Sequence, residues 1–321
     1  MKQKEILQRI RQIPGKENVE FPSQIVFSTI GNSLIMHVKG NGVRDNMQTN
    51  GSAFEGWAIG ILACFPNEID HLILGWDKPR FSENQEERNR QEKHYNRFVL
   101  RAMLFEDVFN WVSIEKENKN EIKKVRSILP TLLINYPKSE SKKKVAESEK
   151  VNKGEAKLER QLVEIMKETI QITDHQLPVG LFEDEVKKDN TFTPRGASQI
   201  DIWQLKDEAI RIFELKDKDN NQVGIISELM FYASTMRLLI QGVIKYPDSL
   251  NEEKKNYRHI QELYMAIKSL KLTHVEAYFL IYTFHPLIED RIDEILSIIN
   301  SGMAKVNVTF KKLFVNDILR K

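Results

Sequence analysis

The sequence predicts an α/β protein, because strand-like and helix-like patterns alternate along its 321 residues. The clearest strand signals are two apolar runs, 200–205 and 209–215, which are rich in Ile, Trp and Phe and are separated by a short polar loop. An amphipathic helical pattern precedes them at 155–169, and a second helical pattern follows at 223–240. These observations predict a strand hairpin flanked by helices in the C-terminal half.

The N-terminal part has an alternating pattern of its own. It predicts helices at 1–13, 52–64 and 83–109, a hairpin of strands at 24–30 and 33–39, and a strand at 69–76. Ser52 is the expected N-cap of the second helix, with Glu55 completing a capping box. The Gly- and Asn-rich stretch 40–51 is not followed by Gly-Lys-Ser/Thr, so we interpret it as an ordinary loop. A separate N-terminal α/β or α+β domain is therefore expected over 1–115.

The composition changes after residue 115. The stretch 138–153 has no aromatic residue and few apolar ones, so it cannot bury enough surface to offset its ordering entropy. We therefore expect a charged linker at 116–153 and a second domain at 154–321. Within that second domain, further strands are predicted at 177–186, 275–284 and 306–315, with a helix at 286–300.

Overall charge and composition indicate an ordinary globular protein. The chain has 48 basic and 46 acidic residues, so contact with nucleic acid would require a local basic patch. Cys64 is the only cysteine, which excludes an intrachain disulfide and fits a reducing compartment. The N-terminus lacks an apolar signal core, and no apolar run reaches membrane-spanning length. A cytoplasmic protein with no membrane partner is expected.

The register of the central hairpin predicts a cluster of charged side chains. If its loop is centred between 207 and 208, Asp201 lies opposite Glu214, and Lys216 is on the same sheet face. Opposed Cβ atoms are roughly 4.5–5.5 Å apart, and two carboxylates at that spacing share a proton or a divalent cation. A neighbouring lysine can orient water and stabilise charge on a phosphate. The alternative is a solvated strand end at which Glu214 pairs with Lys216.

This constellation resembles the PD-(D/E)xK nuclease superfamily over the C-terminal half of the chain. Asp201 is followed by twelve residues, by Glu214-Leu215-Lys216 and by a helix, although Ile200 stands where the family name has Pro. The resemblance implies a restriction-endonuclease-like mixed sheet flanked by helices, and phosphodiester hydrolysis dependent on Mg²⁺ or Mn²⁺. It also implies that Asp201, Glu214 and the Leu215 carbonyl bind the metal and that Lys216 aligns the attacking water.

The same resemblance suggests further site residues. The helix before the sheet often supplies one acidic residue in this family, which makes Glu159 a candidate metal ligand and Glu155 its reserve; a surface carboxylate is the alternative. Glu228 and Tyr232 are one helical turn apart, where family members often have Gln and Tyr. Glu228 would add a carboxylate to the site or only accept a hydrogen bond. Arg195, just before the first strand of the hairpin, is a candidate phosphate contact.

A basic stripe is predicted on the long N-terminal helix. Arg90, Lys93, Arg97 and Arg101 fall three or four residues apart and therefore share one helix face, with His94 beside them. Such a stripe binds a phosphate backbone or is a solvated face supported by Glu86–Arg90 pairing. The seven histidines have no zinc-type spacing.

The expected function is a Mg²⁺-dependent DNA endonuclease acting in restriction or phage defence. The alternative is a catalytically inactive nucleic-acid-binding or scaffolding module on the same fold. RNA cleavage is a third possibility, because a fold does not determine its substrate. A homo-oligomer, or a partner protein bound through the N-terminal domain, is compatible with this organisation.

Overall fold

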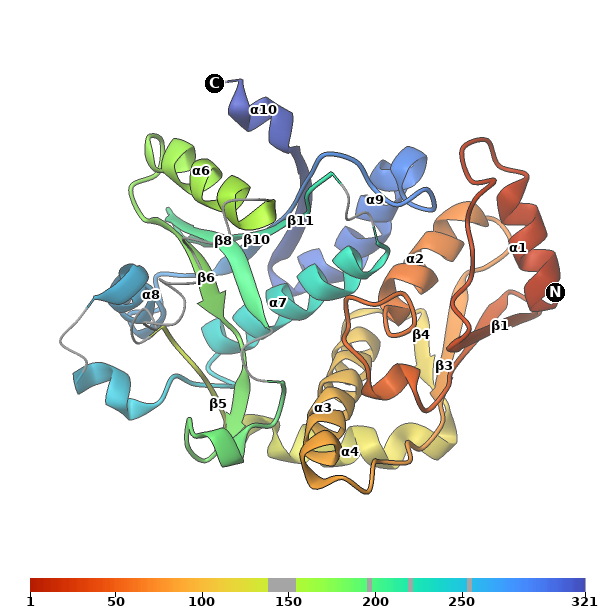
Figure 1. Ribbon diagram of the computed structural model, residues 1–321, viewed down its shortest axis with the longest axis horizontal. Helices are drawn as coiled ribbons and strands as arrows, with labels where there is room; N and C mark the ends of the chain where they lie inside the picture. Colours follow the sequence, from red (N-terminus) through yellow and green to blue (C-terminus); the bar gives the residue numbers. More distant parts are fainter. Residues whose placement is uncertain (138–153, 195–197, 219–221, 253–255, 321) are drawn as a thin grey trace. The chain divides into compact units, whose positions relative to one another are not determined.

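The computed structural model describes residues 1–137, 154–194, 198–218, 222–252 and 256–320 (Figure 1). The chain forms two compact units. Unit 1 comprises 1–130, 221–231 and 284–306, and unit 2 comprises 131–220, 232–283 and 307–321. The units are therefore interleaved along the chain, whereas the sequence suggested consecutive domains. Helix α4 (Lys119–Ile128) lies inside the expected linker and belongs to unit 1, and 138–153 lies outside the described residues.

Unit 1 is built on a four-stranded sheet in the order β1 (Ile25–Ile30), β2 (Ser33–Val38), β3 (His71–Trp76) and β4 (Val112–Ile114). β1 and β2 form the expected antiparallel hairpin, whose turn uses Gly31 at φ +55°, a backbone conformation that glycine adopts without strain. β2, β3 and β4 are parallel. Their connections run through α2 (Phe54–Cys64) and α3 (Gln85–Val108). These β–α–β connections give unit 1 the expected α/β character.

The start of α2 differs from the expected capping box. The N-cap position is occupied by Ala53, which makes no side-chain cap. The Glu55 carboxylate instead accepts hydrogen bonds from the guanidinium of Arg101, and both side chains are buried. A buried carboxylate bonded to a guanidinium gains both hydrogen bonds and the neutralisation of its charge, which a backbone N–H does not supply. The capping-box prediction is therefore wrong.

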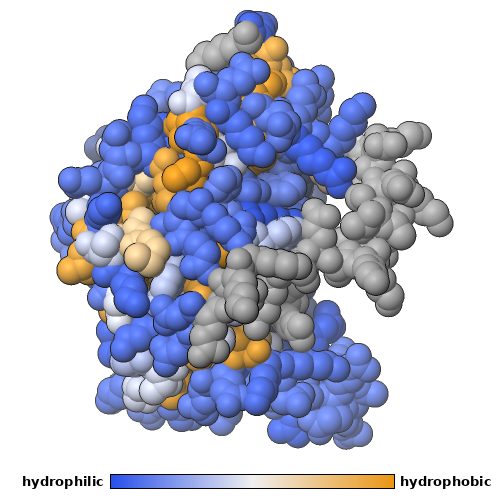
Figure 2. Space-filling model, turned by 90° about the vertical axis from the view of Figure 1, so that its left-hand side faces the viewer, coloured by the Kyte–Doolittle hydropathy of each residue, from blue (hydrophilic) through white to orange (hydrophobic). Residues whose placement is uncertain are grey.

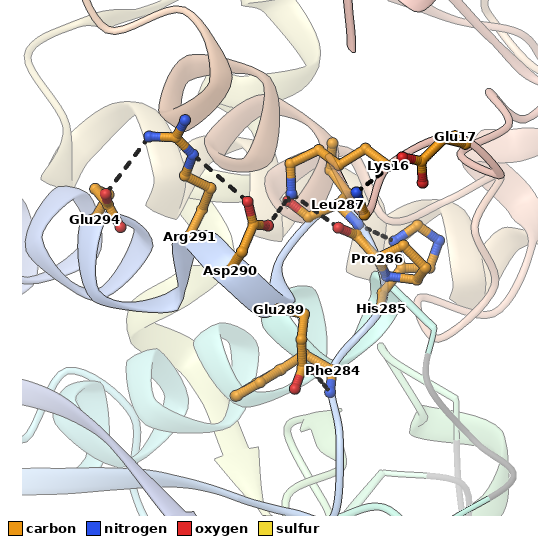
Figure 3. A network of polar contacts seen from close by, with 11 residues as sticks. Lys16, Glu17, Phe284, His285, Pro286, Leu287, Glu289, Asp290, Arg291 and Glu294 are labelled. Atoms are coloured by element: carbon orange, nitrogen blue, oxygen red, sulfur yellow. Dashed lines mark hydrogen bonds and ion pairs between the residues drawn. The ribbon is translucent and has the colours of Figure 1, made fainter. Parts of the chain in front are cut away.

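A distant segment completes unit 1. It contains η7 (Glu289–Arg291), α9 (Ile292–Met303) and η8 (Ala304–Val306), while α1 (Gln3–Arg11) opens the chain. Lys16 joins the two regions: its fully buried ammonium donates to the carbonyls of Pro286 at 2.8 Å and Leu287 at 3.2 Å and to the Asp290 carboxylate (Figure 3). The expected helix at 286–300 consequently begins later, at Ile292, because the preceding carbonyls bind lysine.

Unit 2 contains a five-stranded mixed sheet. Its order is β11 (Val308–Phe314), β10 (His274–Ile281), β9 (Ala209–Leu215), β8 (Gln199–Lys206) and β6 (Thr173–Pro178). β8 is antiparallel to both of its neighbours, β6 and β9, whereas β10 is parallel to both of its neighbours, β9 and β11. A small second sheet pairs β5 (Leu132–Ile134) with β7 (Leu181–Glu183).

Helices flank the five-stranded sheet. On one face, Leu162, Val163 and Met166 of α6 (Glu155–Lys167) belong to one hydrophobic cluster with Ile202 and Leu215. Figure 1 shows α6 and α7 (Gly224–Ile240) on opposite sides of the sheet. Residues 224–231 of α7 belong to unit 1 and 232–240 to unit 2. The remaining elements are α8 (Ile260–Lys268), α10 (Val315–Leu319) and short 3-10 turns such as η6 (Tyr257–His259).

The strand expected at 177–186 is replaced by two shorter strands. β6 begins at Thr173, within a polar stretch that has no alternating apolar pattern, and ends at Pro178. β6 is an edge strand and the side chains of 174–176 are only half-buried, so an apolar pattern is not required there. In the part of the chain that the structure describes, no helix is long and apolar enough to cross a membrane.

Candidate active site

The hairpin register agrees with the one expected from the sequence. Leu205 pairs with Ile210 and Trp203 with Ile212, and the ladder ends at the pair Ile202 and Phe213. The next residues in that register are Asp201 and Glu214. The tight turn places Asp207 at φ 54°, a left-handed conformation that Asp tolerates better than most residues. Directly opposed residues share a face, so the two carboxylate side chains start from the same face of the sheet.

Asp201 is tied to the strand end that carries the Glu-Leu-Lys sequence. Its Oδ2 atom accepts a hydrogen bond from the backbone N–H of Leu215 at 2.8 Å. This is a charge-assisted bond, which is stronger than one between neutral groups. The Asp201 side chain is half-buried and therefore remains in reach of solvent.

Glu214 and Lys216 form a buried ion pair. The Lys216 Nζ donates to Glu214 Oε1, and the two residues are only 1% and 7% exposed. The backbone N–H of Lys216 donates to the carbonyl of Leu280 at 3.0 Å, which extends the parallel pairing beyond the end of β9. The ion pair between Glu214 and Lys216, which we considered as the alternative to a metal site, therefore exists, but it is buried and does not lie at a solvated strand end. Asp201, Glu214 and Lys216 together carry a formal charge of −1.

Glu159 lies on the other side of the sheet. Ile202 packs with α6, and His175 pairs directly with Ile202, so His175 shares the α6 face, whereas Glu214 alternates to the opposite face. The Glu159 carboxylate is 6% exposed and its Oε1 lies 3.0 Å from His175 Nδ1. The structure thus pairs Glu159 with a histidine rather than with Asp201 and Glu214. His175 went unrecognised because β6 lacks an apolar pattern; Glu155, the reserve, is in the first turn of α6.

Glu228 belongs to a polar network of unit 1. Its Oε1 accepts a hydrogen bond from Gln48 Nε2, and its side chain is 1% exposed. Gln48 Oε1 in turn accepts from Asn46 at 3.0 Å, and Asn46 Oδ1 accepts from Arg97 at 3.0 Å. The Gly- and Asn-rich loop is therefore a structural contact for α7. Tyr232, one turn further along α7, is buried in unit 2.

The basic stripe of α3 is split between surface and core. Arg90 is exposed and Lys93 is half-buried, but Arg97 and Arg101 are only 1% and 3% exposed. Arg101 is bonded to Glu55 and to the carbonyl of Ser52, at 2.9 Å. Neither a phosphate-binding stripe nor a solvated face describes these four residues, because the second half of α3 is buried. Burial and the charge of Arg97 also lower the pKa of His94 to about 4, so this histidine is neutral at pH 7.

The remaining expected contact, Arg195, lies outside the described residues. Within the described ranges, no group of three or more His, Cys, Asp and Glu side chains is arranged to hold a metal ion. The site centred on Asp201 therefore offers the carboxylates of Asp201 and Glu214 and the lysine that pairs with Glu214. No protein-family model matches the chain, and neither the curated proteins nor the solved structures contain a significant match.

Proposed function

We propose that this protein is a divalent-metal-dependent nuclease with Asp201 and Glu214 as metal ligands. The supporting observation is the hydrogen bond from the Leu215 N–H to Asp201, which brings that carboxylate beside the Glu214-Leu215-Lys216 segment. A mixed sheet with helices on both sides is also what the resemblance to PD-(D/E)xK nucleases implies. The substrate that we propose is DNA, with restriction or phage defence as the setting.

The chemistry of the donor set fits Mg²⁺ or Mn²⁺. Carboxylate and carbonyl oxygens are the ligands these hard cations prefer, and a bound ion would supply charge stabilisation for a phosphodiester under attack. The Leu215 carbonyl would complete the protein ligands. Lys216 neutralises Glu214 in the structure; once Glu214 is used as a ligand, the ammonium is available to orient water and to stabilise charge on the phosphate.

The burial of the ion pair favours a second candidate. Glu214 and Lys216 neutralise each other away from solvent, and such a pair is stable without any metal. A catalytically inactive nucleic-acid-binding or scaffolding module would keep this pair for packing alone. The two candidates differ in whether the protein hydrolyses phosphodiester bonds.

Cleavage assays separate the candidates. Plasmid, linear duplex, single-stranded DNA and RNA are incubated with Mg²⁺, Mn²⁺ or EDTA, using the wild type and Asp201→Asn, Glu214→Gln and Lys216→Met. A nuclease should cleave only with metal, and each variant should lose about 10²-fold or more in rate. Glu276→Gln is the matched control, because this carboxylate lies on β10 bound to Arg211 and Lys311 and apart from the Asp201 cluster. Wild-type activity in any of the three variants refutes the proposed site. Metal-independent binding without cleavage supports the inactive module.

A further inference from the structure

Backbone strain is concentrated at the edge strand β6 and at the segment that covers it. Seven described non-glycine residues have positive φ, and three of them are Gln176 at 51°, Arg258 at 52° and His259 at 51°. Arg258 binds the backbone of Gln176, so these three residues form one site. Non-glycine residues in this conformation cost free energy and persist where the surroundings impose them, which is common at ligand clamps.

The contacts that the structure describes for Arg258 are with backbone carbonyls and an aromatic ring. Its Nη1 donates to the carbonyls of His175 at 3.4 Å and Gln176 at 3.2 Å, and its guanidinium lies over the Tyr257 ring, 5.0 Å from the centroid. Over the described ranges of the chain, no carboxylate is within ion-pair distance of it. The nearby acids are bound elsewhere: Glu159 lies 3.0 Å from His175 and Glu262 lies 3.2 Å from His259. Among the described residues, therefore, no carboxylate neutralises the positive charge of Arg258.

The place of Arg258 along the sheet is defined by the pairing of β6 with β8. His175 pairs with Ile202 and Leu177 with Ile200, so Gln176 lies between these pairs, at the level of Asp201. Neighbouring strands are about 4.8 Å apart, so the guanidinium held on the outer edge of β6 stands roughly two strand spacings from the Asp201 backbone. That distance suits a group that contacts the same nucleic-acid strand next to the reacting phosphate.

We propose that Arg258 binds a backbone phosphate of the nucleic acid held at the Asp201 site, an inference that rests on the proposed nuclease function. One nitrogen of the guanidinium is used to hold the β6 carbonyls, and arginine has five N–H donors in a rigid fork. The remaining donors match the oxygens of a phosphate, for which arginine is well suited. The side of unit 2 that carries α8 is mainly hydrophilic with small apolar patches, which fits a charged rather than an apolar ligand (Figure 2).

If Arg258 had a purely structural role, its positive charge would not be required. Covering the free carbonyls of an edge strand requires a hydrogen-bond donor and no charge. Arg258→Gln keeps an N–H₂ donor near these carbonyls and removes the charge, whereas Arg258→Lys keeps both a donor and the charge. Lys268→Gln is the matched control, because Lys268 is an exposed cation on the adjacent α8, 5.5 Å from the Tyr264 ring.

The test is the salt dependence of binding to a fluorescein-labelled DNA duplex of random sequence, measured by anisotropy in EDTA. Arg258→Gln should weaken binding about tenfold and should lower the slope of log affinity against log salt by about 0.9, the value for one lost duplex phosphate contact. Arg258→Lys and Lys268→Gln should keep the wild-type slope. Thermal unfolding verifies that each variant is folded.

Chemical modification of the wild-type protein, with and without bound duplex, provides a measurement that needs no variant. The duplex should protect Arg258 from modification by phenylglyoxal, read by peptide mass spectrometry. Equal labelling with and without duplex, or an unchanged slope in folded Arg258→Gln, overturns the assignment of Arg258. If the wild type still cleaves nucleic acid in that case, the proposed nuclease function stands. A wild type that neither binds nor cleaves nucleic acid overturns both.

Discussion

Replacing Lys16 by Met tests how the distant segment 284–306 is held in unit 1. The substitution keeps the length of the side chain and removes a fully buried ammonium with three acceptors, namely the carbonyls of Pro286 and Leu287 and the Asp290 carboxylate. Hydrogen bonds to a charged group contribute about 1.5–3 kcal/mol each to stability, so the loss of all three bonds of the ammonium is large before any compensation. Two terms offset it: the Asp290 side chain is 46% exposed and is rehydrated, and methionine needs no desolvation of charge.

The expected net cost of Lys16→Met is about 2–4 kcal/mol in the free energy of unfolding of unit 1. Because the chain has two units, a single global transition is not assumed. Native-state hydrogen exchange read by mass spectrometry separates them: amides in α9 should lose protection by this amount, and amides in β9 should not. Lys4→Met, an exposed lysine on α1, is the matched control and should change neither.

Asp290→Asn extends this test to the carboxylate. The amide keeps an acceptor for Lys16 but leaves the buried ammonium without a charged partner, so destabilisation of about 1–3 kcal/mol is expected. A loss below about 0.5 kcal/mol for Lys16→Met, or an equal loss of protection in α9 and β9, would show that Lys16 does not anchor this segment.

The hairpin register was predictable because two local constraints agree. The short loop limits how the strands pair, and the apolar side chains of Trp203 and Ile212 must face the same core. A slip by one residue would move one of these side chains to the other face of the sheet. Asp201 and Glu214 then follow from the register without any long-range information. This is why the register that places Asp201 opposite Glu214 could be predicted from the sequence.

Residues whose surroundings come from distant segments were not predictable in this way. The spacing of Arg97 and Arg101 shows that they share a helix face, but only the packing of the loop around Asn46 and of Glu55 shows that the face is buried. Similarly, Arg258 contacts β6 across 82 residues of chain, within a segment that has no strong pattern. The interleaving of the units depends on contacts such as that of Lys16 with Leu287, which are 271 residues apart.

The remaining predictions concern the candidate site, the unit 1 sheet and pH. Mg²⁺ at a hundredfold excess over its Kd should stabilise the wild type by about 2.7 kcal/mol in thermal unfolding; Asp201→Asn should abolish this effect and Lys216→Met should retain it. Gly75→Ala should cost less than about 1 kcal/mol in urea unfolding, because the added Cβ would lie 1.9 Å from Glu115 Oε2, the end of a flexible side chain that can move away from His37; a loss of 2 kcal/mol or more, on the order of an overpacked core, would mean that Glu115 cannot move. The pH dependence of stability should reflect Glu276. Burial alone would raise the pKa of Glu276, but hydrogen bonds from Lys311 and Tyr278 and the charge of Arg211 together lower the pKa below its ordinary value. A carboxyl group with a lowered folded-state pKa stabilises the protein above its unfolded pKa of about 4.3, and this contribution is lost as pH falls through the folded-state pKa. The stability deficit of Glu276→Gln should therefore be full at pH 7 and should shrink as the pH falls below about 4, measured by urea unfolding against pH. A deficit that stays constant from pH 7 to pH 3 would mean that Glu276 contributes through packing and not through its charge.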